Sequence, residues 1–385
     1  MPNSKARVFA AEFVAPARIN LLGEHTDYTG GFVMPMAIPF TTFAGIASSP
    51  NDISHISSEM FDEPLTLAPG DRSKSTLTWT DYPVGVLRKL QELGIDPPPF
   101  SLNLRSDIPP GSGLSSSASV EVATALALLS LTDKTLPLEE VALLCQRAEN
   151  EFVNSPCGIM DQFVVTAAKA GHALLLNTRT LSYEHLPMNT GDLASTRVVI
   201  CNSMVKHSIA AGEYGDRRRE VEAGRAILRE QYPGLIDLAD ASLDQLEACC
   251  TLMPHKSFLR CRHIISENSR VLEARNAMFA GDPVNLGHLM TTAHASERDD
   301  FACSCEETDF LVDTATQLIG CYGARLSGGG FGGCTVNLVH QHHAEDFAAQ
   351  IKLAYQNRFH IQPDTYVCEA VDGAFVRTTK LEFNS

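Results

Sequence analysis

A glycine- and serine-rich segment, from Pro109 to Ser119, is the feature that most constrains the fold of this chain. It reads Pro-Pro-Gly-Ser-Gly-Leu-Ser-Ser-Ser-Ala-Ser and continues into an apolar run that ends near Leu129, which predicts a loop followed by a helix. Gly111 and Gly113 let the backbone turn its N–H groups toward a bulky ligand. The first turn of the helix adds free N–H donors and the positive end of the helix dipole. The segment therefore predicts a site for the phosphates of a nucleotide.

The segment is neither of the two common nucleotide-binding signatures, because it lacks the Walker A lysine and the glycine spacing of a dinucleotide fold. A simpler interpretation is a serine-rich helix cap, since serine is favoured at that position. A cap needs one serine, whereas this stretch has five around two glycines, which favours the phosphate interpretation. A phosphate site without a lysine needs a metal cation, and serine hydroxyls in the first turn are suitable ligands for Mg²⁺.

Composition excludes several other classes of function. The 385 residues are enough for two domains, and 44% are hydrophobic, as in a folded protein. The net charge of -16 repels nucleic acid and anionic lipid, and the longest apolar stretch, 123–131, is far short of the roughly 20 residues of a membrane span. Eleven scattered cysteines predict reduced, buried thiols and a cytoplasmic protein. Structural zinc is the alternative, but no cysteine pair has the two-residue gap of a zinc knuckle.

The remaining sequence alternates irregularly between strand and helix patterns. In the first half, strands are predicted at 8–14, 32–39, 41–47 and 101–104, and helices at 79–93 and 137–151. In the second half, strands are predicted at 197–201 and 365–369 and on both sides of a glycine cluster within 324–339, and helices around 212–230, 242–252, 256–279, 282–295, 306–319 and 344–357. Without a regular strand–helix–strand period, an α+β fold is favoured over a doubly wound sheet.

Two carboxylates in the first half of the chain, Glu149 and Asp161, are candidates for the predicted phosphate site. Glu149 is at the end of the predicted helix 137–151, and Asp161 follows Cys157-Gly158-Ile159-Met160 at a predicted helix start. A carboxylate in the position of Asp161 is either an N-terminal cap or a buried functional acid. On these residues alone, the cap is favoured for Asp161 and a solvated helix position for Glu149.

A polar segment near the N-terminus places Glu24, His25 and Asp27 within one turn, between two apolar strands. Such a mixture of donors and acceptors suits a sugar, whose hydroxyl groups both donate and accept hydrogen bonds. A metal site is an alternative, although a fourth ligand is missing, and a polar turn before a hairpin is another, given Gly30-Gly31. The nearby Arg18 either stabilises a developing phosphoryl charge or anchors its strand through an ion pair.

A second glycine cluster, Ser327-Gly328-Gly329-Gly330-Phe331-Gly332-Gly333, lies between two predicted strands. Five glycines in six positions cost conformational entropy, and a hairpin or bulge needs only one or two. The close approach of a ligand, or of a loop from the other domain, is the better explanation.

Together these segments resemble the galactokinase branch of the GHMP family of small-molecule kinases, which includes homoserine, mevalonate and phosphomevalonate kinases. Residues 18–31 resemble the galactokinase signature, roughly Gly-Arg-Val-Asn-Leu-Ile-Gly-Glu-His-Thr-Asp-Tyr-Asn-Gly-Gly, which is specific. Residues 111–119 resemble the family's phosphate motif, which indicates only the superfamily. Residues 327–333 resemble its third motif. Shorter matches extend the resemblance over nearly the whole chain: 157–163, 202–203, 213–214, 217–219 and 298–300.

The resemblance implies a two-domain α+β fold, with mixed sheets, helices packed on them and an active site in the interdomain cleft. The expected domains are 1–190, with the sugar segment and phosphate loop, and 191–385, with the third motif. The implied activity is ATP-dependent phosphorylation of the C1 hydroxyl of D-galactose, with ATP and Mg²⁺ as cofactors. The sequence does not predict an oligomeric state.

The resemblance also implies a role for each matching residue. Galactose is expected to contact Glu24, His25, Thr26, Asp27, Gly158 and Tyr214. The phosphates are expected to contact Gly111, Ser112, Gly113, Leu114, Ser115, Ser116 and Ser117, and Mg²⁺ to contact Ser117 and Glu149. Asp161 is expected to orient or deprotonate the C1 hydroxyl, and Arg18 to stabilise the charge in transfer.

Three residues depart from the family pattern. Ala17 stands where the family usually has Gly, Thr29 where it often has Asn, and Ser327 where it usually has Thr. The first puts the local backbone geometry in doubt, and none removes a polar group that the chemistry uses. Two alternatives remain at this point. One is a kinase of a related sugar, N-acetylgalactosamine or a uronic acid. The other is a non-catalytic galactose sensor, although such a protein is expected to have a damaged serine loop.

Overall fold

Three β-sheets form the framework of residues 11–206 and 210–378, the part of the chain that this computed structural model describes. The largest sheet has the order β13-β1-β3-β6-β4-β5, and its neighbours pair antiparallel except β4 and β6. Its strands are β1 (Ala11–Asn20), β3 (Pro35–Ser48), β4 (Ser54–Ser58), β5 (Leu65–Leu67), β6 (Phe100–Ser106) and β13 (Phe375–Thr378). The predicted strand 8–14 corresponds to the start of β1, and residues 8–10 lie outside the described residues.

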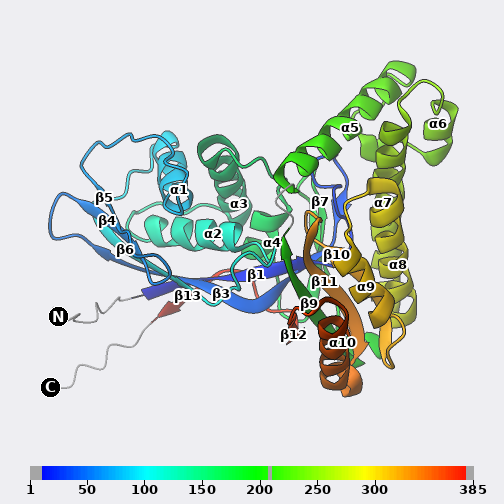
Figure 1. Ribbon diagram of the computed structural model, residues 1–385. Helices are drawn as coiled ribbons and strands as arrows, with labels where there is room; N and C mark the ends of the chain where they lie inside the picture. The colour runs from blue at the N-terminus through cyan, green and yellow to red at the C-terminus, as the bar shows by residue number, and fades with distance from the viewer. Residues whose placement is uncertain (1–10, 207–209, 379–385) are drawn as a thin grey trace.

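Helices α1 (Asp81–Glu92), α2 (Ser116–Leu129), α3 (Leu138–Arg147) and α4 (Met160–Ala167) lie on one face of this sheet (Figure 1). Helix α2 packs directly on β1 and β3, because nearly all of its side chains are apolar and buried. A small antiparallel sheet lies beside α4 and consists of β2 (Phe32–Val33), β7 (His172–Asn177) and β8 (Tyr183–Pro187). The packing of α2 fixes the predicted phosphate loop at the end of β1 that carries Arg18.

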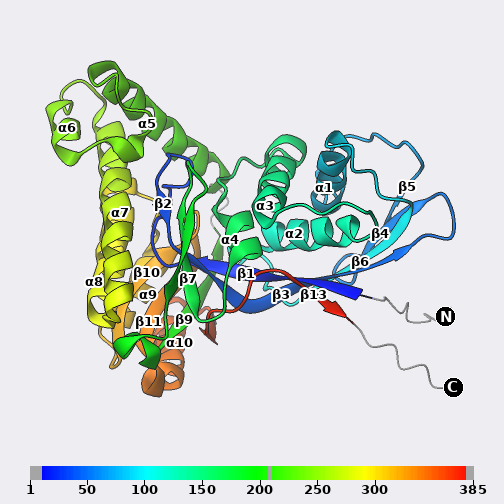
Figure 2. The ribbon, with the colours of Figure 1, turned by 180° about the vertical axis from the view of Figure 1, so that it is seen from behind.

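The second half of the chain forms an antiparallel sheet and the longest helices. The sheet has the order β10-β11-β9-β12, with β9 (Thr196–Lys206), β10 (Cys321–Ser327), β11 (Gly332–His340) and β12 (Asp364–Cys368). The helices are α5 (Ala210–Gln231), α6 (Leu243–Ala248), α7 (His255–Ala280), α8 (Pro283–Ser296), α9 (Glu306–Ala315) and α10 (Ala344–Phe359). Figures 1 and 2 show α7 and α8 side by side, at the end of the molecule opposite β4 and β5.

The two halves share one apolar core, in which Ile19 and Met34 meet Ile200, Val271 and Val336. The chain also returns to its beginning, because β13 pairs with β1 in the first sheet. The α+β architecture with mixed sheets is therefore confirmed, whereas the boundary near residue 190 stays a prediction. Among the described residues, no helix is both long and apolar enough to cross a membrane.

Candidate active site

A cleft of about 570 Å³ opens between the two halves of the molecule and contains most of the predicted sugar-binding residues. This volume lies within the range of small-molecule sites. From the first half the cleft is lined by Arg18, Glu24, His25, Asp27, 154–158, Met160 and Asp161, and from the second half by Tyr214, Gly215, Arg218, Gly328 and Gly329. Sequence reasoning assigned no role to residues 154–157 or to Arg218, although the three consecutive arginines at 217–219 are an unusual cluster of charge.

Arg18 and Asp161 form a two-pronged ion pair in the wall of this cleft. Nε and Nη2 of Arg18 donate to Oδ1 and Oδ2 of Asp161, each over 2.7 Å, and Nη1 donates to the carbonyl oxygen of Gly113 over 2.7 Å. Burial alone would lower the pKa of Arg18, but the adjacent Asp161 raises it above the ordinary value. Arg18 therefore carries a full charge while it joins Asp161 to the phosphate loop.

The phosphate loop does not cap its own helix. Ser115 is the residue before α2 and adopts a left-handed conformation with φ 59°, and its hydroxyl donates to Asp161 instead of accepting from the helix. Asp161, in the first turn of α4, likewise uses both oxygens on Arg18 and caps nothing. The cap interpretations of the serine loop and of Asp161 are therefore wrong. No side chain of the described residues accepts from the first N–H groups of α2, as an anion site requires.

The other loop residues differ in how they can contribute. The Leu114 side chain is buried in the core, so only its backbone can reach a phosphate. The hydroxyl of Ser112 donates to the carbonyl oxygen of Pro109 over 2.8 Å. Gly111 and Ser116 are exposed, and together with Ser117 they line a second cleft.

The second cleft has a volume of about 210 Å³ and mostly apolar walls, and sequence reasoning missed it. Phe61, Trp79 and Tyr82 form its aromatic wall, and the ring planes of Phe61 and Trp79 lie 10° from parallel. A signal was available, because Trp79 is the only tryptophan in the chain and large aromatic residues often line ligand sites. Ser116 and Ser117 border this cleft, and the preceding Ser115 touches Asp161 in the first one. The start of α2 thus separates the two clefts.

Glu149 lies in a π-helical turn, Ala148–Val153, after α3, and its solvated interpretation is wrong because the residue is only 6% exposed. Its Oε2 accepts from Nε2 of Gln162 over 2.7 Å, and the Ser117 hydroxyl is a further hydrogen-bond partner. Burial first, and then the neighbouring Asp161, raise the pKa of Glu149 to about 7. A buried carboxyl and a hydroxyl at the start of α2 are hard oxygen ligands of the kind that Mg²⁺ prefers, so these residues fit the expected cation.

The predicted sugar segment follows β1 and turns its acidic residues into the first cleft. Oε1 of Glu24 accepts from the N–H of Gly328 over 2.8 Å, and burial raises the pKa of Glu24 to about 7. Burial and the nearby Asp161 raise the pKa of Asp27 to about 6. The structure therefore brings three carboxyl groups to one face of the cleft, where they can accept hydrogen bonds from hydroxyl groups.

His25 and Thr26 have different environments within the same segment. The His25 ring stacks on Phe301 with centroids 4.1 Å apart, and burial lowers its pKa well below the ordinary value. His25 is therefore neutral, and its Nε2 has no partner among the described residues. The hydroxyl of Thr26 is buried within hydrogen-bonding distance of two backbone carbonyl oxygens, those of Gly23 and Phe32. Thr26 thus shapes the turn and does not line the cleft.

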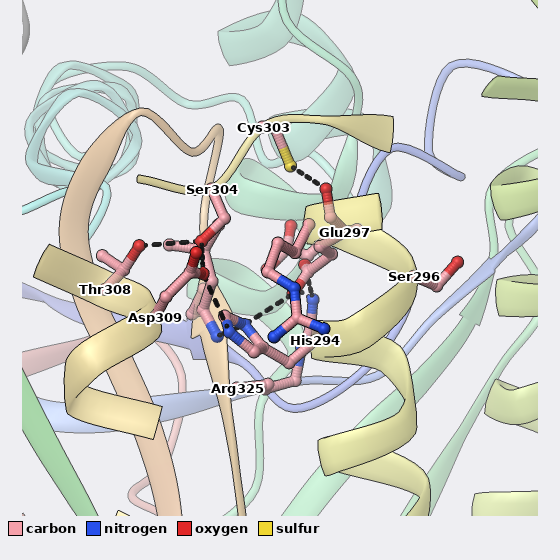
Figure 3. A network of polar contacts seen from close by, with 12 residues as sticks. His294, Ser296, Glu297, Cys303, Ser304, Thr308, Asp309 and Arg325 are labelled. Carbon is pink, nitrogen blue, oxygen red and sulfur yellow. Dashed lines mark hydrogen bonds and ion pairs between the residues drawn. The ribbon is translucent and has the colours of Figure 1, made fainter. Parts of the chain in front are cut away.

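Arg325, Glu297, His294 and Asp309 form a buried polar network (Figure 3), and Arg325 brings it close to Glu24. Arg325 is fully buried, with its Nη2 bonded to Glu297 and 3.7 Å from Oε1 of Glu24. His294 continues the network between Glu297 and Asp309, as Figure 3 shows. Burial alone would lower the pKa of Arg325, but Glu297 and Glu24 raise it. The network therefore fixes the charge next to Glu24, and sequence reasoning assigned none of these supporting residues.

The second glycine cluster forms a hairpin loop whose backbone also packs closely against other segments of the chain. β10 and β11 pair up to Ser327 and Cys334, so the glycines form the hairpin loop. A Cβ on Gly330 would lie 2.3 Å from the carbonyl oxygen of Cys303, and Sγ of Cys334 donates to the carbonyl oxygen of Ser112 over 3.0 Å. Gly328 and Gly333 face the phosphate loop, because an added Cβ would lie 3.8 Å from the carbonyl oxygen of Gly113 and 3.7 Å from that of Ser112, respectively. The expectation that this cluster meets a loop of the first half is therefore confirmed, whereas the tightest approach, at Gly330, is to Cys303 of its own half. Ser327 uses its hydroxyl on the backbone of β1, so its substitution for Thr keeps the contact.

Gly158 and Tyr214 complete the cleft from opposite halves. A Cβ on Gly158 would lie only 1.7 Å from Oδ2 of Asp27, so only glycine leaves Asp27 its position. The Tyr214 ring lies near His25, with ring centroids 5.6 Å apart.

Ala17 stands immediately before Arg18, where the family usually has Gly. It lies at an irregularity in the β1–β3 pairing, but its φ is not positive, so alanine is tolerated there.

Sequence comparison places this geometry in a known group of enzymes. Residues 6–48 match the galactokinase galactose-binding signature, 81–169 match the GHMP kinases N terminal domain, and 274–357 match the GHMP kinases C terminal. The galactokinase of Roseiflexus sp. (strain RS-1) is 41% identical over 360 residues, which cover 93% of this chain and 91% of the relative. The galactokinase of Homo sapiens is 39% identical over 373 residues, with 94% and 91% covered.

Solved structures agree with the sequence comparison. The crystal structure of Lactococcus lactis galactokinase complexed with galactose has a TM-score of 0.89 and 31% identity, and covers 95% of this chain and 94% of that one. The Methanococcus jannaschii mevalonate kinase has a TM-score of 0.69 at 20% identity, which shows the fold alone. The chain therefore belongs to the galactokinase family of the GHMP kinases.

Proposed function

We propose that this chain transfers the γ-phosphoryl group of ATP to the C1 hydroxyl of D-galactose by direct in-line displacement. The single observation that carries the proposal is the Arg18–Asp161 pair, which touches the phosphate loop on one side and faces the sugar segment on the other. Relatives named as galactokinases, and a neighbour solved in complex with galactose, support this substrate.

In this proposal the sugar lies in the first cleft. Glu24 and Asp27 accept hydrogen bonds from its hydroxyl groups, and the neutral ring of His25 lines the same cleft. Tyr214 and Gly158 close the two sides of the ring site, and Thr26 acts only by holding the turn. Asp161 orients the C1 hydroxyl. It acts either as a base that accepts the proton of this hydroxyl or as a negative charge that polarises the O–H bond.

The phosphates lie across the start of α2. Backbone N–H groups from Gly111 to Ser117 bind their oxygens, and Arg18 neutralises charge that develops as the phosphoryl group moves. Ser117 and Glu149 would hold Mg²⁺, which neutralises the triphosphate when bound. Reduced thiols support a cytoplasmic location, since all eleven cysteines, each within the described residues, are free.

A test of the sugar side is Gly158→Ala, which should raise KM for galactose about 10–100-fold. The added Cβ would overlap Asp27, so that carboxylate must turn away and lose a charged hydrogen bond, a contact worth about 1.5–3 kcal/mol. Gly234→Ala is the matched control, because a Cβ there meets open space without a positive φ. An unchanged KM in the Gly158 variant would show that Asp27 does not hold the sugar.

A test of the nucleotide side is Trp79→Ala, which should raise KM for ATP about tenfold with little change in kcat. We assign the apolar second cleft to the adenine ring, and stacking of a base on an aromatic side chain is worth about 1–3 kcal/mol. Trp79→Phe keeps an aromatic face and should retain most of the affinity. If both variants have the KM of the unmodified enzyme, the base lies elsewhere.

The substrate itself is tested by ADP release from ATP with a panel of sugars. Galactose should be the preferred acceptor, ahead of N-acetylgalactosamine and galacturonic acid. Preference for either of these would identify a kinase of a related sugar. Galactose binding without ADP release would identify a sensor, which the complete serine loop argues against.

A further inference from the structure

Helix α2 has a polar face that the proposed phosphate and sugar sites do not explain. Ser117, Glu121 and Thr124 are spaced i, i+4 and i+7, so they lie along one face of an otherwise mainly apolar helix. Glu121 and Thr124 are completely buried, and each has an oxygen atom without a hydrogen-bond partner among the described residues. Ser117, at the start of this face, is a proposed Mg²⁺ ligand, and the face continues from that site into the interior.

Gln162 connects this face to Glu149. Its Nε2 donates to Oε2 of Glu149 over 2.7 Å and to Oε2 of Glu121 over 3.1 Å, so both amide hydrogens are used. The side chain of Gln162 is completely buried on α4, and α2 and α4 pack together. The orientation of the amide, with nitrogen toward Glu149, is therefore determined by these two carboxyl groups, and Sγ of Cys157 is a weaker third acceptor 3.8 Å from the nitrogen.

Glu121 has a feature that lowers the stability of the fold. Its Oε1 has no hydrogen-bond partner among the described residues, and a buried polar atom without a partner costs about 1–3 kcal/mol. An apolar side chain of the same length would avoid that penalty, but it could not accept the hydrogen bond from Gln162. Departures of this kind from good local packing are expected where a function needs them.

We propose that Glu121 is a positioning residue of the cation site, acting through Gln162 on Glu149. As the acceptor of one amide hydrogen, it holds the nitrogen of Gln162 against the Glu149 carboxylate and fixes that carboxylate for Mg²⁺. Without Glu121 the nitrogen keeps only Glu149 and the more distant sulfur of Cys157 as acceptors, so the amide and the carboxylate that it holds are less firmly fixed. Hydrogen-bonded partners of metal ligands typically contribute 10–100-fold to metal affinity. This inference rests on the proposed role of Glu149.

The test is the Kd of Mn²⁺ for enzyme saturated with a non-hydrolysable ATP analogue, measured by water proton relaxation. Glu121→Met should raise this Kd about tenfold while Tm changes little, because the variant removes an unpartnered buried oxygen but also leaves one amide hydrogen of Gln162 without its acceptor. Glu121→Gln keeps an acceptor oxygen for Gln162 and should restore the affinity. Gln162→Met removes the donor of the same hydrogen bond and should also weaken Mn²⁺ binding.

The matched control is Thr124→Val, which removes another buried, unpartnered oxygen one turn further along the same face. It should leave the Kd of Mn²⁺ unchanged. Unmodified Mn²⁺ affinity in a folded Glu121→Met protein, or an equal loss in Thr124→Val, would overturn the inference. If Glu149→Gln binds Mn²⁺ normally, the cation site is assigned wrongly and the inference falls with it. Galactose phosphorylation by the unmodified enzyme tests the proposed function separately.

Discussion

Asp161→Asn should reduce kcat for galactose phosphorylation by about 10²–10⁴-fold, the range expected when a positioned acid–base group is lost. Asparagine has nearly the same shape, so the cleft stays filled. It cannot take a proton from the C1 hydroxyl, and its NH₂ group would face one of the two Arg18 donors that now reach Asp161. The measurement is ADP release at saturating galactose and ATP, where a difference in binding does not affect the rate.

The effect on folding needs its own control, because Asp161 pairs with a buried arginine. The side chains of Arg18 and Asp161 are 7% and 24% exposed. The pair of Arg88 with Asp71 is similarly placed, at 10% and 27%, and lies outside both clefts. Asp71→Asn should therefore lower Tm by a comparable or smaller amount and leave kcat unchanged. Near-normal turnover in Asp161→Asn would remove Asp161 from the mechanism.

Features fixed by neighbouring residues could be predicted from the sequence. The turn between α7 and α8 is an example, because Gly281 takes the left-handed conformation with φ 67°, Asp282 caps the next helix and Pro283 begins it. The serine loop is another, since its glycines and the apolar run after it specify a loop and a helix locally. Both the turn between the two helices and the serine loop with its helix are found where they were predicted.

Strands with a weak pattern of their own, or with a distant partner, could not be predicted in this way. Strands β4, β5, β7, β8 and β13 were missed. Tyr183–Pro187, which forms β8, has one buried residue and lacks the alternation that indicates a strand. β13 pairs with β1, a strand more than 350 positions earlier in the chain, and its sequence contains no sign of that partner.

The same distinction applies to the site. The residues that matter were found through their motifs, but their contacts join segments far apart in the sequence. Arg18 and Asp161 are separated by 143 positions, and Glu24 and Gly328 by 304. The environment of Glu149 was misjudged because a carboxylate at a helix end is usually solvated. Only the packing of α2 and α4 around it reveals that it is buried.

Arg18→Ala should lower kcat by about 10²–10³-fold, which corresponds to the roughly 2.7–4 kcal/mol that a charge-stabilising donor contributes to a transition state. The guanidinium is the only cation of the described residues that touches both Asp161 and the phosphate loop. Arg18→Lys keeps the charge but loses the two-pronged geometry, so it should recover only part of the rate. An unchanged kcat in Arg18→Ala would mean that the arginine merely anchors β1.

The double variant Arg18→Ala with Asp161→Asn distinguishes a cooperating pair from two independent groups. Groups that act as a unit are strongly non-additive, because removal of either one already disables the other. Arg18 orients Asp161 through two hydrogen bonds, so we expect the double variant to be about as slow as the slower single variant. If the losses instead multiply, each residue acts on the phosphoryl transfer separately. The ion pair would then serve only to hold both side chains in the wall of the cleft.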